Sequence, residues 1–231
     1  MTRTATFARE QLRTPFTLVL LVAVPAFFVA ATAGVLRDFA RALGGALAGD
    51  AAGALAAGWS AAFVAGTLGL FQATSSRGAD RRLALAGAGA GRVAASRITA
   101  SLVLAVVAAA AGFVALLIRQ GVAHPWHAAA AILAFALIYL AVGILIGAVI
   151  TGPLEGALAV AFVFLLDVFS GPGMAPHAAF YSVSRKAADL LISAATGQAS
   201  PASDWFALGA VVTVALASSF AAFAYSARSR G

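Results

Sequence analysis

Cysteine is absent from this chain, and charged side chains are scarce. Without cysteine the protein can form no disulfide, no thiolate nucleophile and no cysteine metal site. Only 10% of the 231 residues are charged, whereas a soluble domain carries about 25%. Lysine occurs once, at Lys186, far from the glycine-rich stretch 87–91. A Walker A phosphate loop needs a lysine after its glycines, so we do not expect this chain to hydrolyse ATP by itself.

Long uncharged stretches fill most of the sequence, which is 62% hydrophobic. No charged side chain occurs between Arg97 and Arg119. A helix of that length, rising about 1.5 Å per residue, covers the ~30 Å hydrocarbon core of a bilayer. Similar stretches recur along the chain. The sequence therefore predicts an all-α, polytopic membrane protein that forms a single transmembrane domain over residues 1–231.

Six membrane spans are expected from these stretches. Gly143 and Gly147 form a G-x-x-x-G pattern on the fourth span, which permits two helices to approach closely. We expect this pattern to pack within the bundle rather than between subunits, because small residues are common throughout the chain. The six expected spans are 16–36, 52–74, 98–118, 126–150, 153–169 and 205–225.

The basic residues indicate the orientation of these spans. The formal net charge is +7, and the basic residues stand between apolar stretches. Their expected partner is therefore the anionic cytoplasmic leaflet of the bilayer and not nucleic acid. An even number of spans puts both termini on one side, which then holds ten of the fifteen basic residues. The positive-inside rule predicts that both termini are cytoplasmic, in a cell inner (plasma) membrane.

Two connections are too long to be simple turns. The first, 75–97, is basic and is expected in the cytoplasm. The second, 171–204, is expected outside and contains a predicted amphipathic helix over 177–195. Arg185 and Lys186 on that helix are too costly for the bilayer centre, so we expect them to face water or headgroups. The pattern predicts a re-entrant or interfacial helix before the last span.

Few polar residues lie at membrane depth. Asp167 stands near the outer end of the fifth span, where we expect water to reach it. Its carboxylate has two interpretations, a structural cap or interface residue and a residue of a substrate path. His124 and His127 have the spacing of metal ligands, but two ligands do not make a site, and His177 is isolated. We predict no metal site and no catalytic residue.

The order of these features resembles the permease subunits of type-2 ATP-binding cassette (ABC) exporters. Residues 1–15, through their basic segment 7–15, are similar to the cytoplasmic interfacial helix of that family. The loop 75–97 resembles the loop that holds the family's coupling helix. The stretch 165–176, with Ser170-Gly171-Pro172 inside it, resembles the family's Ser-Gly segment and the short external helices that follow it.

The resemblance implies a transport subunit without enzymatic activity. Two permease chains, identical or paralogous, would pair in the bilayer, each on a cytoplasmic ABC ATPase that binds ATP and Mg²⁺. This chain would form the path for a hydrophobic or amphipathic substrate. The implied ATPase contacts are Arg77, Asp80, Arg81, Arg82 and Leu83, and the implied residues of the substrate path are Asp167, Ser170, Phe180 and Tyr181.

Two other functions stay open at the level of the sequence. One is a membrane assembly factor or scaffold without transport. The other is an ion-coupled secondary transporter, which usually places ionisable groups in the middle of the membrane and breaks helices in both halves. Asp167 is the one candidate for such a group here, which counts against this function. An ATPase that copurifies with the chain would distinguish the exporter from both alternatives.

Overall fold

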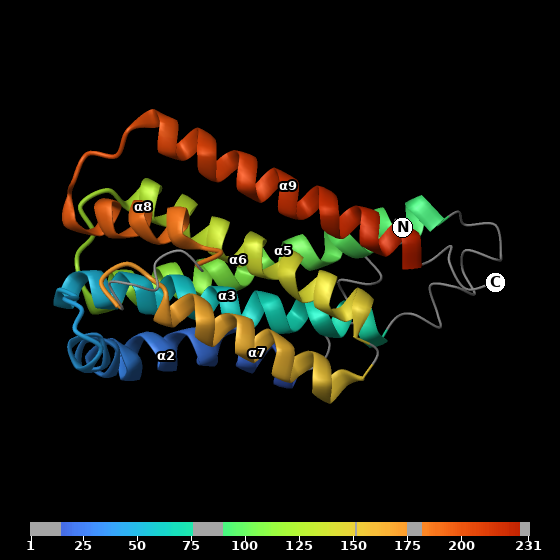
Figure 1. Ribbon diagram of the computed structural model, residues 1–231, viewed down its shortest axis with the longest axis horizontal. Helices are drawn as coiled ribbons and strands as arrows, with labels where there is room; N and C mark the ends of the chain where they lie inside the picture. The colour runs from blue at the N-terminus through green and yellow to red at the C-terminus, as the bar shows by residue number, and fades with distance from the viewer. Residues whose placement is uncertain (1–14, 76–89, 151, 175–181, 227–231) are drawn as a thin grey trace.

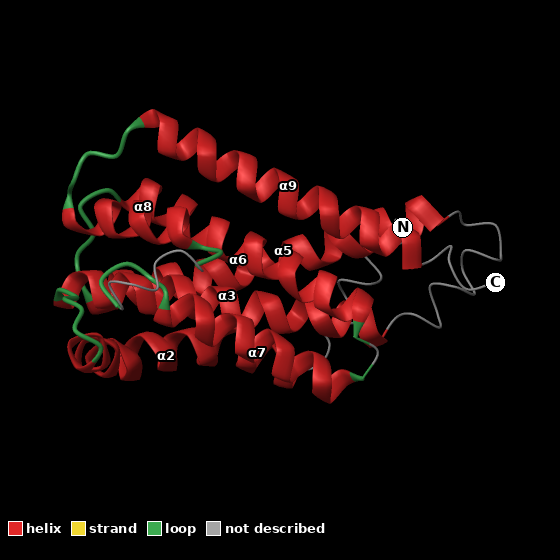
Figure 2. Cartoon of the chain, in the orientation of Figure 1, coloured by secondary structure: helices red, strands yellow, loops and turns green. Residues whose placement is uncertain are grey.

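The computed structural model describes residues 15–75, 90–150, 152–174 and 182–226. Every regular element in these ranges is a helix, which confirms the all-α prediction (Figures 1 and 2). The predicted interfacial helix before residue 15 lies outside the described residues. The helices are α2 (Pro15–Ala42), α3 (Gly49–Ser75), α5 (Ala90–Arg119), α6 (Pro125–Val149), α7 (Pro153–Phe169), α8 (Arg185–Thr196) and α9 (Ala202–Ser226).

The long helices run back and forth along one axis (Figure 1). One end of the bundle holds the connections 43–48 and 120–124 together with α8; we call it the α8 end. The other end holds the close of α3, the start of α7 at Pro153 and the close of α9; we call it the Pro153 end. Helices α7 and α9 are joined at the α8 end, and the chain passes through α8 between them.

Five of these helices are long and apolar enough to cross a membrane. Together they define a polytopic membrane protein. Helix α7 is apolar but has only 17 residues, and α8, with 12 residues, is far too short to cross. The five candidate spans are Ala23–Ala42, Gly49–Thr74, Ala95–Arg119, Pro125–Val149 and Ala202–Tyr225.

Helix α3 forms the centre of the bundle. It packs against α2, α5, α6, α7 and α8, and every residue from 51 to 62 is buried. The cause is its composition, since most of its residues are alanine or glycine. Small side chains let neighbouring helix backbones come close on all sides. Such close packing holds helices together in a bilayer, where the hydrophobic effect does not drive one helix against another.

The closest approach is between α3 and α6. A Cβ atom on Gly143 would overlap the carbonyl oxygen of Gly66, and one on Gly147 would lie 2.7 Å from the Cβ of Ala73. Gly69 on α3 faces the carbonyl oxygen of Leu140 in the same way. The expectation that Gly143 and Gly147 pack within the bundle is confirmed.

Candidate functional site

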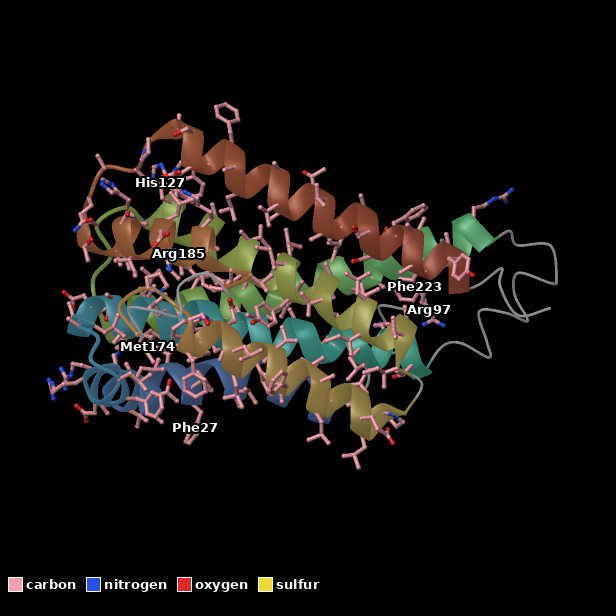
Figure 3. All side chains as sticks on the ribbon, viewed as in Figure 1. Phe27, Arg97, His127, Met174, Arg185 and Phe223 are labelled. Carbon is pink, nitrogen blue, oxygen red and sulfur yellow. The ribbon has the colours of Figure 1, made fainter. Side chains whose placement is uncertain are left out.

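Helix α8 packs on the bundle with one face buried and one face exposed. Its first residue lies further into the bundle than its last, as Figure 3 shows for Arg185 relative to the α8 end. At its other end, the backbone N–H of His124 donates to the carbonyl of Ala194 over 2.9 Å. Its apolar face is buried against α3 and α6. The buried residues are Ala187, Ala188, Leu190, Leu191, Ala194 and Ala195.

The two ends of α8 have different causes. Ser184 precedes the helix without a side-chain capping bond, and its N–H and hydroxyl donate to Asp167, whereas Gly197 closes the helix in the left-handed conformation with φ of 78°, which glycine adopts without strain. The predicted helix 177–195 is therefore longer than the observed one, although 177–181 lie outside the described residues. Gly58 on α3 leaves room for α8, because a Cβ there would lie 2.9 Å from Cδ2 of Leu191.

Asp167 is the anchor point of this segment. Its carboxylate accepts hydrogen bonds from the Tyr139 hydroxyl at 2.9 Å, the Ser182 hydroxyl at 2.7 Å and the Ser184 backbone N–H at 3.1 Å. The Ser184 hydroxyl donates a fourth bond, to Oδ2. Tyr139 comes from α6, whereas both serines immediately precede α8. One carboxylate thus joins α6, α7 and the start of α8. We call these four residues the Asp167 cluster.

The expectation that water reaches Asp167 is wrong, because the residue is fully buried. The physical reason is that the chain turns back after α7 and brings residues 182–184 over the carboxylate. Four donors replace its lost hydration, as a buried charge requires. The position matches the interpretation of Asp167 as a structural cap. Its contact with a substrate stays a prediction.

The residues just after α7 are held by the α2–α3 connection. Gly45 lies so close to this segment that a Cβ on it would overlap the carbonyl oxygen of Met174, and a Cβ on Gly173 would lie 2.8 Å from the carbonyl oxygen of Ala46. Ser170 is buried at the end of α7. Next to it, Gly171 packs against the indole ring of Trp59 on α3. The α2–α3 connection and Trp59 therefore hold the residues before 175–181. Asp167 holds the residues after 175–181.

Charged side chains cover the polar face of α8. Arg185 Nε lies 3.9 Å from Asp189 Oδ2, and Lys186 Nζ lies 2.9 Å from Asp204 Oδ1 on α9. The hydrogen bond and charge of Asp204 raise the pKa of Lys186. Burial raises the pKa of Asp189, against the opposing charges of Arg185 and Lys186. The side chains of Arg185 and Lys186 are 41% and 51% exposed. That they face water or headgroups stays a prediction.

His124 and His127 lie near each other at the α8 end, where Figure 3 shows His127. Their ring centroids are 5.7 Å apart, and the His127 ring lies 5.3 Å from Trp205 at the start of α9. Within the described ranges, no third potential metal ligand joins them. The contacts fit an aromatic belt at a membrane surface.

Other predicted residues lie outside the described ranges. These are His177 and the predicted residues Arg77, Asp80, Arg81, Arg82, Leu83, Phe180 and Tyr181.

The fold is that of an all-helical, polytopic membrane protein with a short helix, α8, packed on the bundle before its last long helix. Comparisons with family models, with curated proteins and with solved structures found no match.

Proposed function

We propose that this protein is the permease subunit of an ABC exporter, which forms the membrane path for a hydrophobic or amphipathic substrate and is driven by a separate ATPase. The observation that carries the proposal is the position of α8. It follows α7 and precedes α9 in the chain, and it lies at the end of the bundle opposite to the close of α3 and the start of α5 (Figure 1). A transport subunit driven by an ATPase needs a segment that opens the substrate path at one end of the bundle and a loop that the ATPase can push at the other end.

The proposal includes a sixth crossing by α7. Its 17 residues would rise about 25 Å, slightly less than the hydrocarbon core. It runs beside the long helices from the Pro153 end toward the α8 end (Figure 1). Six crossings place both termini on one side, and the distribution of basic residues makes that side the cytoplasm.

Cysteine labelling tests this topology in the naturally cysteine-free chain. We expect Gly91→Cys, at the start of α5, to react with a membrane-impermeant maleimide only after the cells are opened, and Gln198→Cys, after α8, to react in intact cells. A Cβ at Gly91 meets open space, and Gln198 is exposed, so neither change disturbs packing. Labelling of both positions from the same side would contradict the six-span topology.

The segment 77–83 is the proposed docking element for the ATPase. We expect the double variant Arg81→Glu and Arg82→Glu to lose ATPase copurification and substrate-stimulated ATP hydrolysis, because the reversed charges oppose those of the partner groove. The double variant Arg228→Glu and Arg230→Glu is the matched control, with the same charge change on the same predicted side. Equal effects of the two variants, or no effect of the first, would mean that 77–83 sets the orientation of the chain in the membrane and does not dock the ATPase.

A buried carboxylate inside a bundle is the observation that favours the second candidate function, an ion-coupled transporter. In the Asp167 cluster, however, four donors already occupy the two carboxylate oxygens. A group that must gain and lose an ion needs a free coordination position, so this geometry supports an anchor more than a coupling site. An imposed ion gradient that drives export without ATP would favour the second function.

A further inference from the structure

Trp59 carries an unsatisfied polar atom at the centre of the bundle. The residue is fully buried, yet its indole nitrogen Nε1 has no hydrogen-bond partner, and it is the one such buried side-chain atom among the described residues. A buried tryptophan usually directs its N–H to an acceptor, because an unpaired donor away from water costs free energy. The unpaired N–H therefore calls for an acceptor that the described chain does not supply.

The six-membered ring of Trp59 faces the end of α7. A Cβ on Gly171 would lie 2.6 Å from Cζ2 and 3.0 Å from Cη2 of Trp59, and Cζ2 is two bonds away from Nε1. Glycine at this position lets the backbone cover this side of the ring. Ser170, the preceding residue in the chain, is also buried and carries a hydroxyl. Moving the segment that starts at Gly171 would open space beside Cζ2, two bonds away from the unpaired donor.

Aromatic rings lie next to this point, further into the bundle. Phe63 follows Trp59 by about one turn on α3, and its ring centroid is 5.1 Å from that of Phe164 on α7. Phe164 also contacts Phe28 and Tyr139, at 6.4 Å and 6.0 Å. A hydrocarbon chain can lie against such rings, whereas a polar group has few partners there.

The surroundings of Trp59 disfavour an anionic ligand. No arginine or lysine is buried in the described part of the chain. A carboxylate or phosphate would therefore enter the bundle without a basic partner. An ester, ketone or amide oxygen carries an acceptor without that penalty.

We propose that Trp59 Nε1 and the Ser170 hydroxyl bind the uncharged carbonyl or ester oxygen of an amphipathic molecule, whose hydrocarbon chain lies against Phe63 and Phe164. The inference rests on the proposed function, since that molecule would be the substrate on its path. Residues 171–174 move away from Trp59 to admit it. Trp59 is then the residue that selects acceptor-bearing chains over plain hydrocarbons.

Fluorescence quenching tests this site on the permease alone. The chain has three tryptophans, so Trp126→Phe with Trp205→Phe leaves Trp59 as the single indole. In phosphatidylcholine nanodiscs, a monoacylglycerol with a brominated chain should quench Trp59 saturably. We expect half-saturation at about a tenfold lower concentration than for a brominated alkane of equal chain length, a ratio that one added hydrogen bond supplies.

Two variants and a charged probe complete the test. Ser170→Ala in the same background should raise the half-saturation concentration several-fold, and Trp59→Phe in the otherwise unchanged chain should lower the monoacylglycerol retained after purification, as counted by mass spectrometry. Equal half-saturation for monoacylglycerol and alkane overturns the site, and tighter binding of a brominated fatty-acid anion overturns the uncharged class. Because no ATPase is present, these results are independent of whether the proposed ATPase coupling holds.

Discussion

Gly143→Ala should unfold or strongly destabilise the protein, although the change adds a single methyl group. The new Cβ would overlap the carbonyl oxygen of Gly66, which belongs to a helix backbone and cannot move as a side chain does. Overpacking typically costs about 1–3 kcal/mol, and a backbone contact puts this position at or above the upper end. The effect is measured as the thermal midpoint and the monodisperse yield in detergent.

Gly209→Ala is the matched control for this change. Gly209 lies within α9, and no atom lies within 4 Å of a Cβ placed there. Alanine favours a helix over glycine by about 1 kcal/mol, so this variant should be as stable as the wild type or slightly more so. If the two variants show the same stability, the close packing of α3 on α6 is contradicted.

Asp167→Asn should release α8 from the bundle. The amide keeps one acceptor oxygen but turns a donor toward hydroxyls that now donate to the carboxylate. Each hydrogen bond to a charged group contributes about 1.5–3 kcal/mol, so losing part of the Asp167 cluster should let the start of α8 open more often. Ala188→Cys reports the release, because Ala188 is fully buried on α8. The reaction of this introduced thiol with maleimide should become fast in the Asp167→Asn background.

Asp38→Asn provides the control for the loss of one carboxylate. Asp38 lies on α2 with an exposed side chain, paired with Arg41 at 3.3 Å. Such surface pairs contribute little, so the introduced thiol on α8 should stay protected in this background. Tyr139→Phe removes one donor of the cluster and should give an intermediate rate. Protection of the same thiol in the Asp167→Asn variant would show that α8 is held by its apolar face alone.

The sequence predicts the helices well because their signals are local. Uncharged length locates α3, α6 and α9, and Pro153 and the Gly171-Pro172 pair correctly bound α7. Helix α5 starts at Ala90, eight residues before the predicted span, because its helix continues through Arg92 and Arg97, which uncharged length leaves out. The start of α8 at Arg185 is eight residues later than predicted. Its amphipathic pattern continues upstream in the sequence, and the pattern does not reveal that Ser184 is held by a distant carboxylate.

The site could be predicted only in part, because its contacts join residues far apart in the chain. Asp167 is identified by its charge, but its burial depends on residues 182–184 folding back over it. Sequence reasoning missed Tyr139 and Trp59, although both carry polar groups in the middle of apolar spans instead of at the membrane surface. Trp and Tyr usually lie at the membrane surface, so a Trp or Tyr inside an apolar span is the sequence signal that could have identified both residues.

Isolation of the intact wild-type protein with its partners tests the central proposal most directly. The protein is extracted from its native membrane in mild detergent, and the complex is analysed by native mass spectrometry and by ATP hydrolysis. The account predicts an assembly of two permease chains with two ATPase chains, whose ATP hydrolysis is lost with Arg81→Glu and Arg82→Glu. A chain that purifies without any ATPase, and hydrolyses no ATP in any fraction that contains it, would contradict the account.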